Sequence, residues 1–373
     1  MSPGAPRTPL AAHAAPVRRK GTIRVMIVDD SLTVRTIFKR MVESDPALAI
    51  IGTASSAERA IAQLASEPAD VVLLDLEMPG MGGLDALPAI LATPGGPQVL
   101  VVSSLTVDGA EHTLAALQMG AADTLRKPRP GGFTEDYRTQ LLGKIRALGA
   151  RNAETGSAAT GLAERSFARP AANLRARRPE VIAVGASTGG IHALGQMLGT
   201  LGHDCILPIL ITQHLPTSFI PVFARQVENA CGRPTDIAAD GMVIQPGRIM
   251  IAPGHGHLLV RRSGDRLLAR ICQEPAPSGC LPSVDPMLAS LALACDGRAL
   301  GVILSGMGRD GVLGAKELVS AGGTIYAQDA ESSAVWGMPG AVAKAGLAGL
   351  IASPPRLGEA ITAQASAVLL RHG

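Results

Sequence analysis

Residues 23–42 read IRVMIVDDSLTVRTIFKRMV, and this stretch decides the fold of the first half of the chain. Its first six residues are apolar apart from one arginine and include β-branched side chains, which predicts a buried strand over Ile23–Val28. After two aspartates and a serine, the apolar residues of Leu32–Val42 recur with the period of a helix. A strand that leads through a short turn into a helix is the repeating unit of a parallel sheet covered by helices.

The same unit recurs along the chain until about Arg146. Further strands are expected at Ala49–Thr53, Asp70–Leu74, Gln98–Val102 and Asp123–Leu125, and further helices at Ala57–Ala65, Leu84–Leu91 and Gly109–Met119. The pattern predicts an α/β domain over residues 21–148, with a parallel sheet of five strands.

The second half of the chain predicts another domain of the same class. Between residues 149 and 179 the periodicity is lost and Ala, Arg, Ser, Gly and Pro dominate, so we expect a linker. Over residues 180–373 strands are again expected, at Val181–Val184, Ile206–Thr212, Arg248–Ile251, Ala299–Leu304 and Thr324–Ala327. This predicts a doubly wound α/β domain with a mostly parallel sheet and one antiparallel hairpin, formed by Leu258–Arg262 and Arg266–Cys272 around a Gly-containing turn.

The composition argues against several classes of protein. No stretch approaches the roughly 18 uninterrupted apolar residues of a membrane-spanning helix, and residues 1–20 lack the apolar region of a secretory signal and are expected to be a disordered leader. A net charge of +3 and 2% aromatic residues offer little for nucleic-acid binding. The five cysteines form no C-x-x-C pair, which fits a reducing compartment. We therefore expect a cytoplasmic protein with no nucleic-acid partner and no membrane insertion.

Polar side chains follow the predicted strands of the first domain. Asp29, Asp30, Asp75, Ser103 and Lys127 all stand at or just after a strand's end. Because parallel strands share one carboxyl edge, these groups should meet there. Three carboxylates favour a hard cation such as Mg²⁺, and a phosphoryl group on Asp75 would be neutralised by the metal, Lys127 and a hydrogen bond from Ser103. Taken singly, each residue would more often be a turn or cap residue, and only the set favours phosphorylation.

The first domain resembles the receiver domain of response regulators. It carries VMIVDDS at residues 25–31, DLEMPGMGG at 75–83, Ser103 and Lys127-Pro128. The resemblance implies a flavodoxin-like (CheY-like) fold with Asp75 as the phosphorylated residue. It further implies Mg²⁺ ligands at Asp30, Asp75 and the carbonyl of Glu77, with Asp29 assisting. Gly82 stands where such receivers commonly carry Asp, at a position expected to lie in a loop.

A serine stands in a tight turn at the start of the second domain. The strand Val181–Val184 runs into GASTGG, whose small residues around Ser187 allow a sharp strand-to-helix turn that projects the hydroxyl. The helix N-terminus that follows favours negative charge nearby. The next strand ends at His214 in TQHLP, and a later one leads to Asp310 in SGMGRDG. Three such residues at one sheet edge predict a hydrolase whose base activates the serine hydroxyl.

Each of these three residues has a simpler explanation alone. The turn around Ser187 is equally suited to cradling a phosphate. His214 alone would more often be a hydrogen-bonded structural residue, and Asp310 alone would more often cap the following helix. Together they favour catalysis. Their order, Ser then His then Asp, differs from that of the α/β-hydrolases, so that fold is not implied.

From about Val181 to Ile351 the chain resembles the methylesterase domain of the chemotaxis protein-glutamate methylesterase (CheB) family. It carries GASTGG, QHLP, GMVIQPGRIMIAPG, PSVD, LSGMGRDG, AQD and GMPGAV in the family's order. The resemblance implies Ser187 as the nucleophile, His214 as the general base and acid, and Asp310 as the residue that orients His214. It also implies the Met307 backbone amide as an oxyanion donor and Thr188 as a hydrogen-bonding support.

Some residues depart from the family pattern or invite a second interpretation. Cys280 stands where a His, Tyr or Arg often precedes PSVD, and Ala334 where a Cys often precedes GMP, both at positions expected to line the substrate groove. Cys280 has no base near it in the sequence, so a structural or groove thiol is expected rather than a nucleophile. His255 and His257 have no carboxylate or third histidine nearby, so a loop role is expected rather than a metal site.

Together with these features, the two resemblances imply a phosphorylation-controlled protein-glutamate methylesterase. It would hydrolyse γ-methyl esters of chemoreceptor glutamates through an acyl-enzyme, release methanol, and deamidate receptor glutamines by the same path, without a cofactor for the ester chemistry. The implied partners are methyl-accepting chemotaxis receptors and a CheA-type histidine kinase as phosphodonor.

A receiver joined to a nucleotide-binding regulator would leave His214 and Asp310 without a role. A DNA-binding output would need a basic helix-turn-helix, and none is readable after Glu180.

Overall fold

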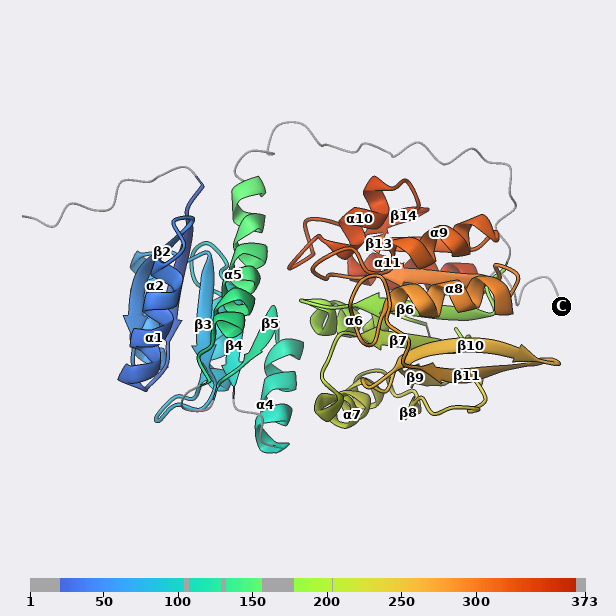
Figure 1. The fold of residues 1–373 in the computed structure, drawn as a ribbon, viewed down its shortest axis with the longest axis horizontal. Helices are drawn as coiled ribbons and strands as arrows, with labels where there is room; N and C mark the ends of the chain where they lie inside the picture. The colour runs from blue at the N-terminus through green and yellow to red at the C-terminus, as the bar shows by residue number, and fades with distance from the viewer. Residues whose placement is uncertain (1–20, 104–106, 129–131, 156–177, 203, 367–373) are drawn as a thin grey trace, which may run out of the picture.

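A computed structural model of the chain describes residues 21–103, 107–128, 132–155, 178–202 and 204–366. Within them the chain forms two α/β units, each built around its own parallel sheet (Figure 1). The expected leader, residues 1–20, and most of the expected linker, residues 149–179, lie outside the described residues.

The first unit is a parallel sheet of five strands in the order β2-β1-β3-β4-β5. Its strands are β1 (Ile23–Val28), β2 (Leu48–Ala54), β3 (Val71–Asp75), β4 (Gln98–Ser103) and β5 (Asp123–Arg126). Its helices are α1 (Leu32–Glu43), α2 (Ala57–Ser66), α3 (Gly83–Leu91), α4 (Val107–Gln118) and α5 (Glu135–Thr155). The order confirms the flavodoxin-like fold expected from the sequence. Helix α5 continues to Thr155, past the expected end of this domain at residue 148.

Local sequence explains the sharp change from strand to helix in this unit. Strand β3 is buried at every position, as its run of apolar residues demands. Helix α1 begins directly after the two aspartates because the Ser31 hydroxyl accepts a hydrogen bond from the Val34 amide and so caps the first turn. The aspartates are therefore held at the carboxyl edge of the sheet.

The second unit contains a parallel sheet of seven strands in the order β14-β13-β12-β6-β7-β9-β8. Its strands are β6 (Val181–Ala186), β7 (Ile209–Gln213), β8 (Thr235–Ile237), β9 (Ile249–Ile251), β12 (Ala299–Ile303), β13 (Thr324–Gln328) and β14 (Leu350–Ala352). The chain builds outward from β6 toward β8 and then returns to add β12, β13 and β14 on the other side. The order therefore reverses beside β6, which is where ligands bind in sheets of this class.

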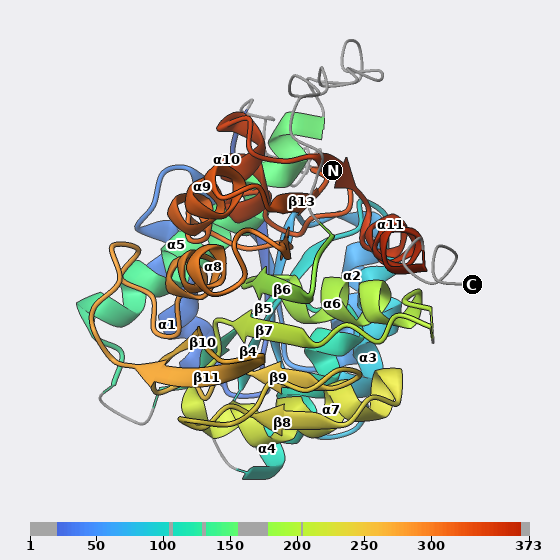
Figure 2. The ribbon, with the colours of Figure 1, turned by 90° about the vertical axis from the view of Figure 1, so that its right-hand side faces the viewer.

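Helices cover both faces of this sheet (Figure 2). On one face lie α6 (Gly190–Gly199), α7 (Ile220–Cys231), which follows the short 3₁₀ helix η1 (Thr217–Phe219), and α11 (Pro354–Ser366), and on the other α8 (Val284–Ala294), α9 (Val312–Ser320) and α10 (Met338–Lys344). Each face has its own cluster of buried apolar side chains, which confirms the doubly wound architecture.

The expected hairpin is present as a small sheet of its own. Strands β10 (His257–Ser263) and β11 (Arg266–Cys272) pair antiparallel, and β10 packs against α8. Two edge strands, β8 and β14, were not predicted from the sequence. Each has only three residues, too few for a hydrophobic period to be recognised.

The two units are in direct contact. Helix α4 of the first unit lies against α6 and α7 of the second (Figure 1). The contact is apolar in part, because one cluster of buried side chains includes Leu117 of α4 together with Ile191 of α6 and Phe219 of η1. No helix in the described part of the chain is both long and apolar enough to cross a bilayer.

Candidate active site and acidic site

The acidic side chains of the first unit meet at the carboxyl edge of its sheet, as the sequence predicts. Ligand oxygens of Asp29, Asp30 and Asp75 lie within 4.8 Å of one another. The Lys127 ammonium lies 2.8 Å from Asp29 Oδ2 and 2.7 Å from Asp75 Oδ2. Burial raises the pKa of Asp75, although the hydrogen bond from Lys127 opposes the change. Three carboxylates at this spacing suit a hard, oxygen-seeking cation such as Mg²⁺.

Two further predicted residues, Glu77 and Ser103, make hydrogen bonds in the first unit. The backbone amide of Glu77 donates a hydrogen bond of 3.1 Å to Asp75 Oδ1. The Ser103 hydroxyl accepts a hydrogen bond of 2.7 Å from Thr113, and both side chains are buried. Thr113 belongs to α4, the helix that contacts the second unit, so the pair connects the acidic edge to the interface between the units. Sequence reasoning missed Thr113 because it lies in mid-helix with no motif around it.

In the second unit, Ser187 directly follows β6 in a turn that only small residues permit. Its amide donates to the Ser305 carbonyl at 3.0 Å, and its carbonyl accepts from the Gln213 side chain at 3.0 Å. Gly189 has a φ of 75°, and a Cβ there would lie 2.5 Å from the Cβ of Ala334. The turn therefore requires glycine, and Ala334 packs directly against it.

His214 and Asp310 form a hydrogen-bonded pair at the neighbouring strand ends. His214 Nε2 lies 2.8 Å from Asp310 Oδ2. Asp310 also accepts hydrogen bonds from the Ser283 hydroxyl at 2.7 Å and the Val284 amide at 2.8 Å. Burial would raise the pKa of Asp310, but the bonds from His214, Ser283 and Val284 outweigh it and hold the pKa well below its usual range. The carboxylate is thus charged and fixed toward the imidazole.

The imidazole of His214 is correspondingly more basic than a free histidine. Burial alone would lower the pKa of His214, but the hydrogen bond to Asp310 and the neighbouring Cys280 raise it to about 9. Because Nε2 faces Asp310, Nδ1 is the ring nitrogen left to act on another group. No hydrogen bond joins Ser187 to His214 among the described residues, and such contacts are often loose before substrate binds.

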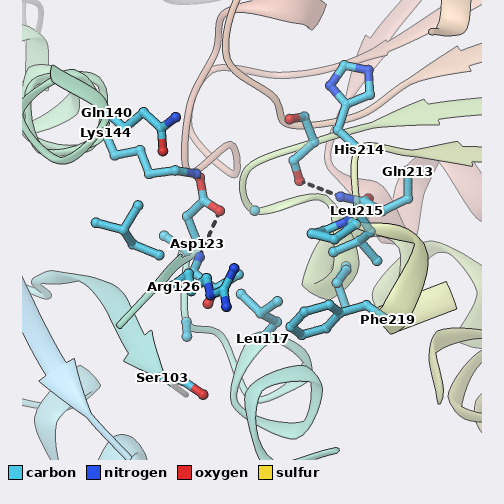
Figure 3. Close-up of a pocket in the computed structure, with 18 residues that line it drawn as sticks. Ser103, Leu117, Asp123, Arg126, Gln140, Lys144, Gln213, His214, Leu215 and Phe219 are labelled. Atoms are coloured by element: carbon cyan, nitrogen blue, oxygen red, sulfur yellow. Dashed lines mark hydrogen bonds and ion pairs between the residues drawn. The ribbon is translucent and has the colours of Figure 1, made fainter. Parts of the chain in front are cut away.

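A cavity of about 440 Å³ lies between the two units and contains both Ser187 and His214 in its wall (Figure 3). From the first unit it is lined by residues of α4, β5 and α5, including Leu117, Asp123 and Lys144. The hydroxyl of Thr188 donates to Asp123 Oδ2 at 2.5 Å, and Lys144 binds the same oxygen at 2.5 Å. The first unit therefore covers the serine. Thr188, predicted to support the hydrolytic site, is held by the other unit in this arrangement.

The loop that carries Met307 passes close to Ser187. A Cβ placed on Gly306 would lie 2.9 Å from the Cβ of Ser187, so only glycine allows this approach. Among the described residues no group accepts a hydrogen bond from the Met307 amide. An amide with no partner beside the serine suits an oxyanion donor.

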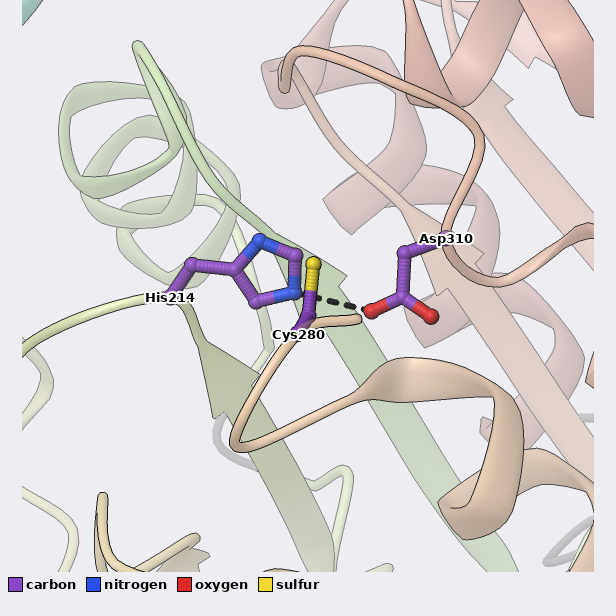
Figure 4. A group of neighbouring side chains, drawn as sticks. All are labelled: His214, Cys280 and Asp310. Carbon is purple, nitrogen blue, oxygen red and sulfur yellow. Dashed lines mark hydrogen bonds and ion pairs between the residues drawn. The ribbon is translucent and has the colours of Figure 1, made fainter. Parts of the chain in front are cut away.

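Cys280 has no base near it in the sequence, but the structure brings one close to it in space. The segment that precedes α8 brings Cys280 to the catalytic edge, where its sulfur, His214 and Asp310 have ligand atoms within 4.8 Å of one another (Figure 4). The sequence could not show this because the two residues lie on separate loops far apart along the chain.

His257 has a structural role in the described structure. It is buried, accepts a hydrogen bond at Nδ1 from the Ser283 amide at 2.9 Å, and lies 2.9 Å from the Glu274 carbonyl through Nε2. Since Ser283 in turn donates to Asp310, His257 helps to position the carboxylate. His255 is exposed, and among the described residues neither histidine belongs to a cluster that could hold a metal.

The fold and the two sites define a class: a response-regulator receiver joined to a hydrolase domain with a doubly wound parallel sheet. Family models agree, because residues 25–133 match the response regulator receiver domain and residues 182–361 match the CheB methylesterase. The chain is 41% identical over 87% of its length to protein-glutamate methylesterase/protein-glutamine glutaminase 1 of Rhodospirillum rubrum, covering 91% of that protein. It is 38% identical over 98% of its length to the protein-glutamate methylesterase/protein-glutamine glutaminase of Azospirillum brasilense, covering 99% of it.

The chain belongs to the family of protein-glutamate methylesterases/protein-glutamine glutaminases, with a receiver domain at its N-terminal end. Among solved structures, the catalytic domain of Thermotoga maritima CheB methylesterase is similar to it, with 29% identity, a TM-score of 0.47, and coverage of 49% of this chain and 97% of that one.

Proposed function

We propose that the chain hydrolyses glutamate γ-methyl esters on methyl-accepting chemoreceptors and deamidates receptor glutamines, under the control of phosphorylation at Asp75. The observation that carries the proposal is that Ser187 and His214 line one cavity, and that His214 is hydrogen-bonded to Asp310. The family to which the chain belongs supports the substrate class. The hydrolysis would take place on the cytoplasmic helices of the receptors.

The hydrolysis proceeds in two steps, formation of an acyl-enzyme on Ser187 and its release by water. His214 takes the proton of the Ser187 hydroxyl, whose oxygen attacks the ester carbonyl, and then gives that proton to the departing methanol. Asp310 stabilises the imidazolium that forms in between. The Met307 amide donates to the oxyanion. Water then releases the glutamate by the same path, and a glutamine would release ammonia in place of methanol.

The receiver supplies the control. Asp75 accepts the phosphoryl group from a CheA-type histidine kinase, and Lys127 is already within hydrogen-bonding distance of it. Asp30, Asp75 and the Glu77 carbonyl would hold Mg²⁺, with Asp29 assisting, and the metal would neutralise charge on the phosphoryl oxygens. Ser103 would donate a hydrogen bond to the phosphoryl group.

The path from Asp75 to the serine runs through α4. Moving the Ser103 hydroxyl toward a phosphoryl group disturbs its bond with Thr113, and with it the position of α4 against α6 and α7. The covered arrangement then loses stability relative to an open one in which receptor helices reach Ser187. Phosphorylation in this account shifts a population and leaves the chemistry unchanged.

The experiment that tests the proposed activity is incubation of the full chain with receptor-containing membranes that carry labelled methyl esters. We expect methanol to be released, and mass spectrometry of receptor peptides to show glutamate where methyl-glutamate stood. A nucleotide-binding role for the turn at Ser187 would instead give no methanol and measurable binding of a nucleotide.

The pH dependence of the reaction follows from the basicity of His214. The imidazole must be neutral to accept the serine proton, and its raised pKa of about 9 keeps it protonated at neutral pH. The rate should therefore rise with pH and level off only near that pKa. Initial rates of methanol release, measured from about pH 6 to about pH 10 and corrected with a Ser187→Ala blank, check this. A rate that is flat or falls over this range would show that His214 is not the base.

The interface predicts a variant with constitutive activity. Asp123→Asn removes the charge that holds the Thr188 hydroxyl and Lys144. A hydrogen bond to a charged group is worth roughly 1.5 kcal/mol or more, so the open population should rise by about tenfold. Methanol release by the unphosphorylated variant should increase by a similar factor. The matched control is Glu111→Gln, which breaks an exposed pair with Arg225 and should change the rate only slightly. Equal rates for Asp123→Asn and wild type would show that this contact does not hold the receiver over Ser187.

A further inference from the structure

The catalytic edge of the second unit contains a cluster of three metal-binding side chains that the hydrolytic mechanism does not use as a set. Cys280, His214 and Asp310 each present a ligand atom, and these atoms lie within 4.8 Å of one another (Figure 4). Cys280 is a free thiol and is half-buried. A thiol, an imidazole and a carboxylate are the ligand types that Zn²⁺ prefers in proteins.

We propose that Cys280, His214 and Asp310 form an inhibitory Zn²⁺ site that blocks hydrolysis by occupying the catalytic imidazole. The thiolate selects for Zn²⁺ against Mg²⁺ and Ca²⁺, which prefer oxygen ligands. The site is thus chemically distinct from the acidic site of the receiver, where all the side-chain ligands are carboxylates.

The geometry needs only a small adjustment to accept the ion. Two bonds of about 2.0–2.1 Å at a tetrahedral angle place a nitrogen and an oxygen ligand about 3.3 Å apart. His214 Nε2 and Asp310 Oδ2 are 2.8 Å apart, so the imidazole must retreat by about half an ångström. His214 follows the end of β7 in a loop, which leaves room for that shift. The ion takes the place of the proton in the His–Asp hydrogen bond.

The surroundings support the carboxylate ligand and give access to the ion. Asp310 is held in place by Ser283 and the Val284 amide, so its orientation does not depend on His214. A separate cavity of about 430 Å³ is lined by Cys280, Met307 and Asp310 and provides a path for the ion and for a water molecule as the fourth ligand.

Binding is accompanied by loss of protons. The Cys280 thiol gives up its proton to solvent when the sulfur binds Zn²⁺, and His214 must bind through a neutral nitrogen. With Zn²⁺ on Nε2, the neutral ring carries its proton on Nδ1 and can no longer take the proton of Ser187 there. Methanol release therefore stops while folding and phosphorylation continue. The inhibition by Zn²⁺ should therefore become stronger as the pH rises. The rate without Zn²⁺ rises with pH as well.

The test of binding uses the full chain with excess Mg²⁺, so that the receiver site is already filled. Alkylation of each cysteine by iodoacetamide is followed by mass spectrometry with and without added Zn²⁺. We expect Zn²⁺ to protect Cys280 in the wild type and not in His214→Gln, and to leave Cys272 equally reactive in both. Equal protection of both cysteines, or none at Cys280, overturns the proposal. This measurement needs no ester hydrolysis, so it stands apart from the proposed function.

The test of inhibition compares Cys280→Ser with the matched control Cys272→Ser. Each variant's rate of methanol release is expressed relative to its own rate without Zn²⁺. Loss of a metal ligand should raise the half-inhibiting Zn²⁺ concentration of Cys280→Ser by at least about tenfold, and Cys272→Ser should match the wild type. Inhibition of all three proteins at one Zn²⁺ concentration contradicts the assignment, and thermal melting shows whether each variant is folded.

Discussion

Ser187→Ala is expected to lower methanol release from methylated receptor by several orders of magnitude, because it removes the hydroxyl that we propose as the nucleophile. A residual rate above that of water is expected from the oxyanion donor and from substrate binding. The fold should be retained, since the Ser187 contacts found in the structure are made by its backbone.

The control for this variant is Ser320→Ala, an exposed serine at the end of α9 that is remote from the cavity. Both variants should show the same thermal transition and the same phosphorylation at Asp75. Near-normal methanol release by Ser187→Ala would exclude Ser187 as the nucleophile.

Asp310→Asn is expected to reduce the rate by about a thousandfold to ten-thousandfold, because an amide at this place holds the imidazole in the wrong tautomer. In the place of Oδ2, its amino group would also face the Val284 amide, a donor that now points at a carboxylate oxygen. Loss of the negative charge should in addition lower the pKa of His214. The residual activity should therefore level off at a lower pH than that of the wild type.

The neighbouring Asp285 provides a matched control for this loss of charge. Burial raises the pKa of Asp285 to about 6, and its side chain accepts a hydrogen bond from the Gly314 amide rather than from His214. Because its side chain is not bonded to His214, Asp285→Asn should lower the rate far less than Asp310→Asn does. An unchanged rate in Asp310→Asn would remove Asp310 from the triad.

The sequence predicted the elements of both sheets where the hydrophobic pattern was long enough to read. Strand β1 was predicted at its observed residues, and Asp75 and Lys127 were expected at one edge because parallel strands share their carboxyl ends. The short strands β8 and β14 were missed because three residues carry no period.

What the sequence could not provide was contact between distant loops and between the two units. The proximity of Cys280 to His214 depends on the path of the loop before α8, and no local pattern encodes that path. The bond from Thr188 to Asp123 depends on how the receiver docks on the second unit. Both arise from tertiary packing and carry no signature at the level of motifs.

The central claim, that the receiver covers a Ser187 hydrolytic site and phosphorylation of Asp75 uncovers it, is tested most directly by comparing initial rates of methanol release on one receptor preparation. The proteins are the full chain with and without a small-molecule phosphodonor, Asp75→Asn with phosphodonor, and a fragment that begins near Glu180. We expect the fragment and the phosphorylated chain to be fast, and the unphosphorylated chain and Asp75→Asn to be slow. A fragment no faster than the unphosphorylated chain would contradict the account.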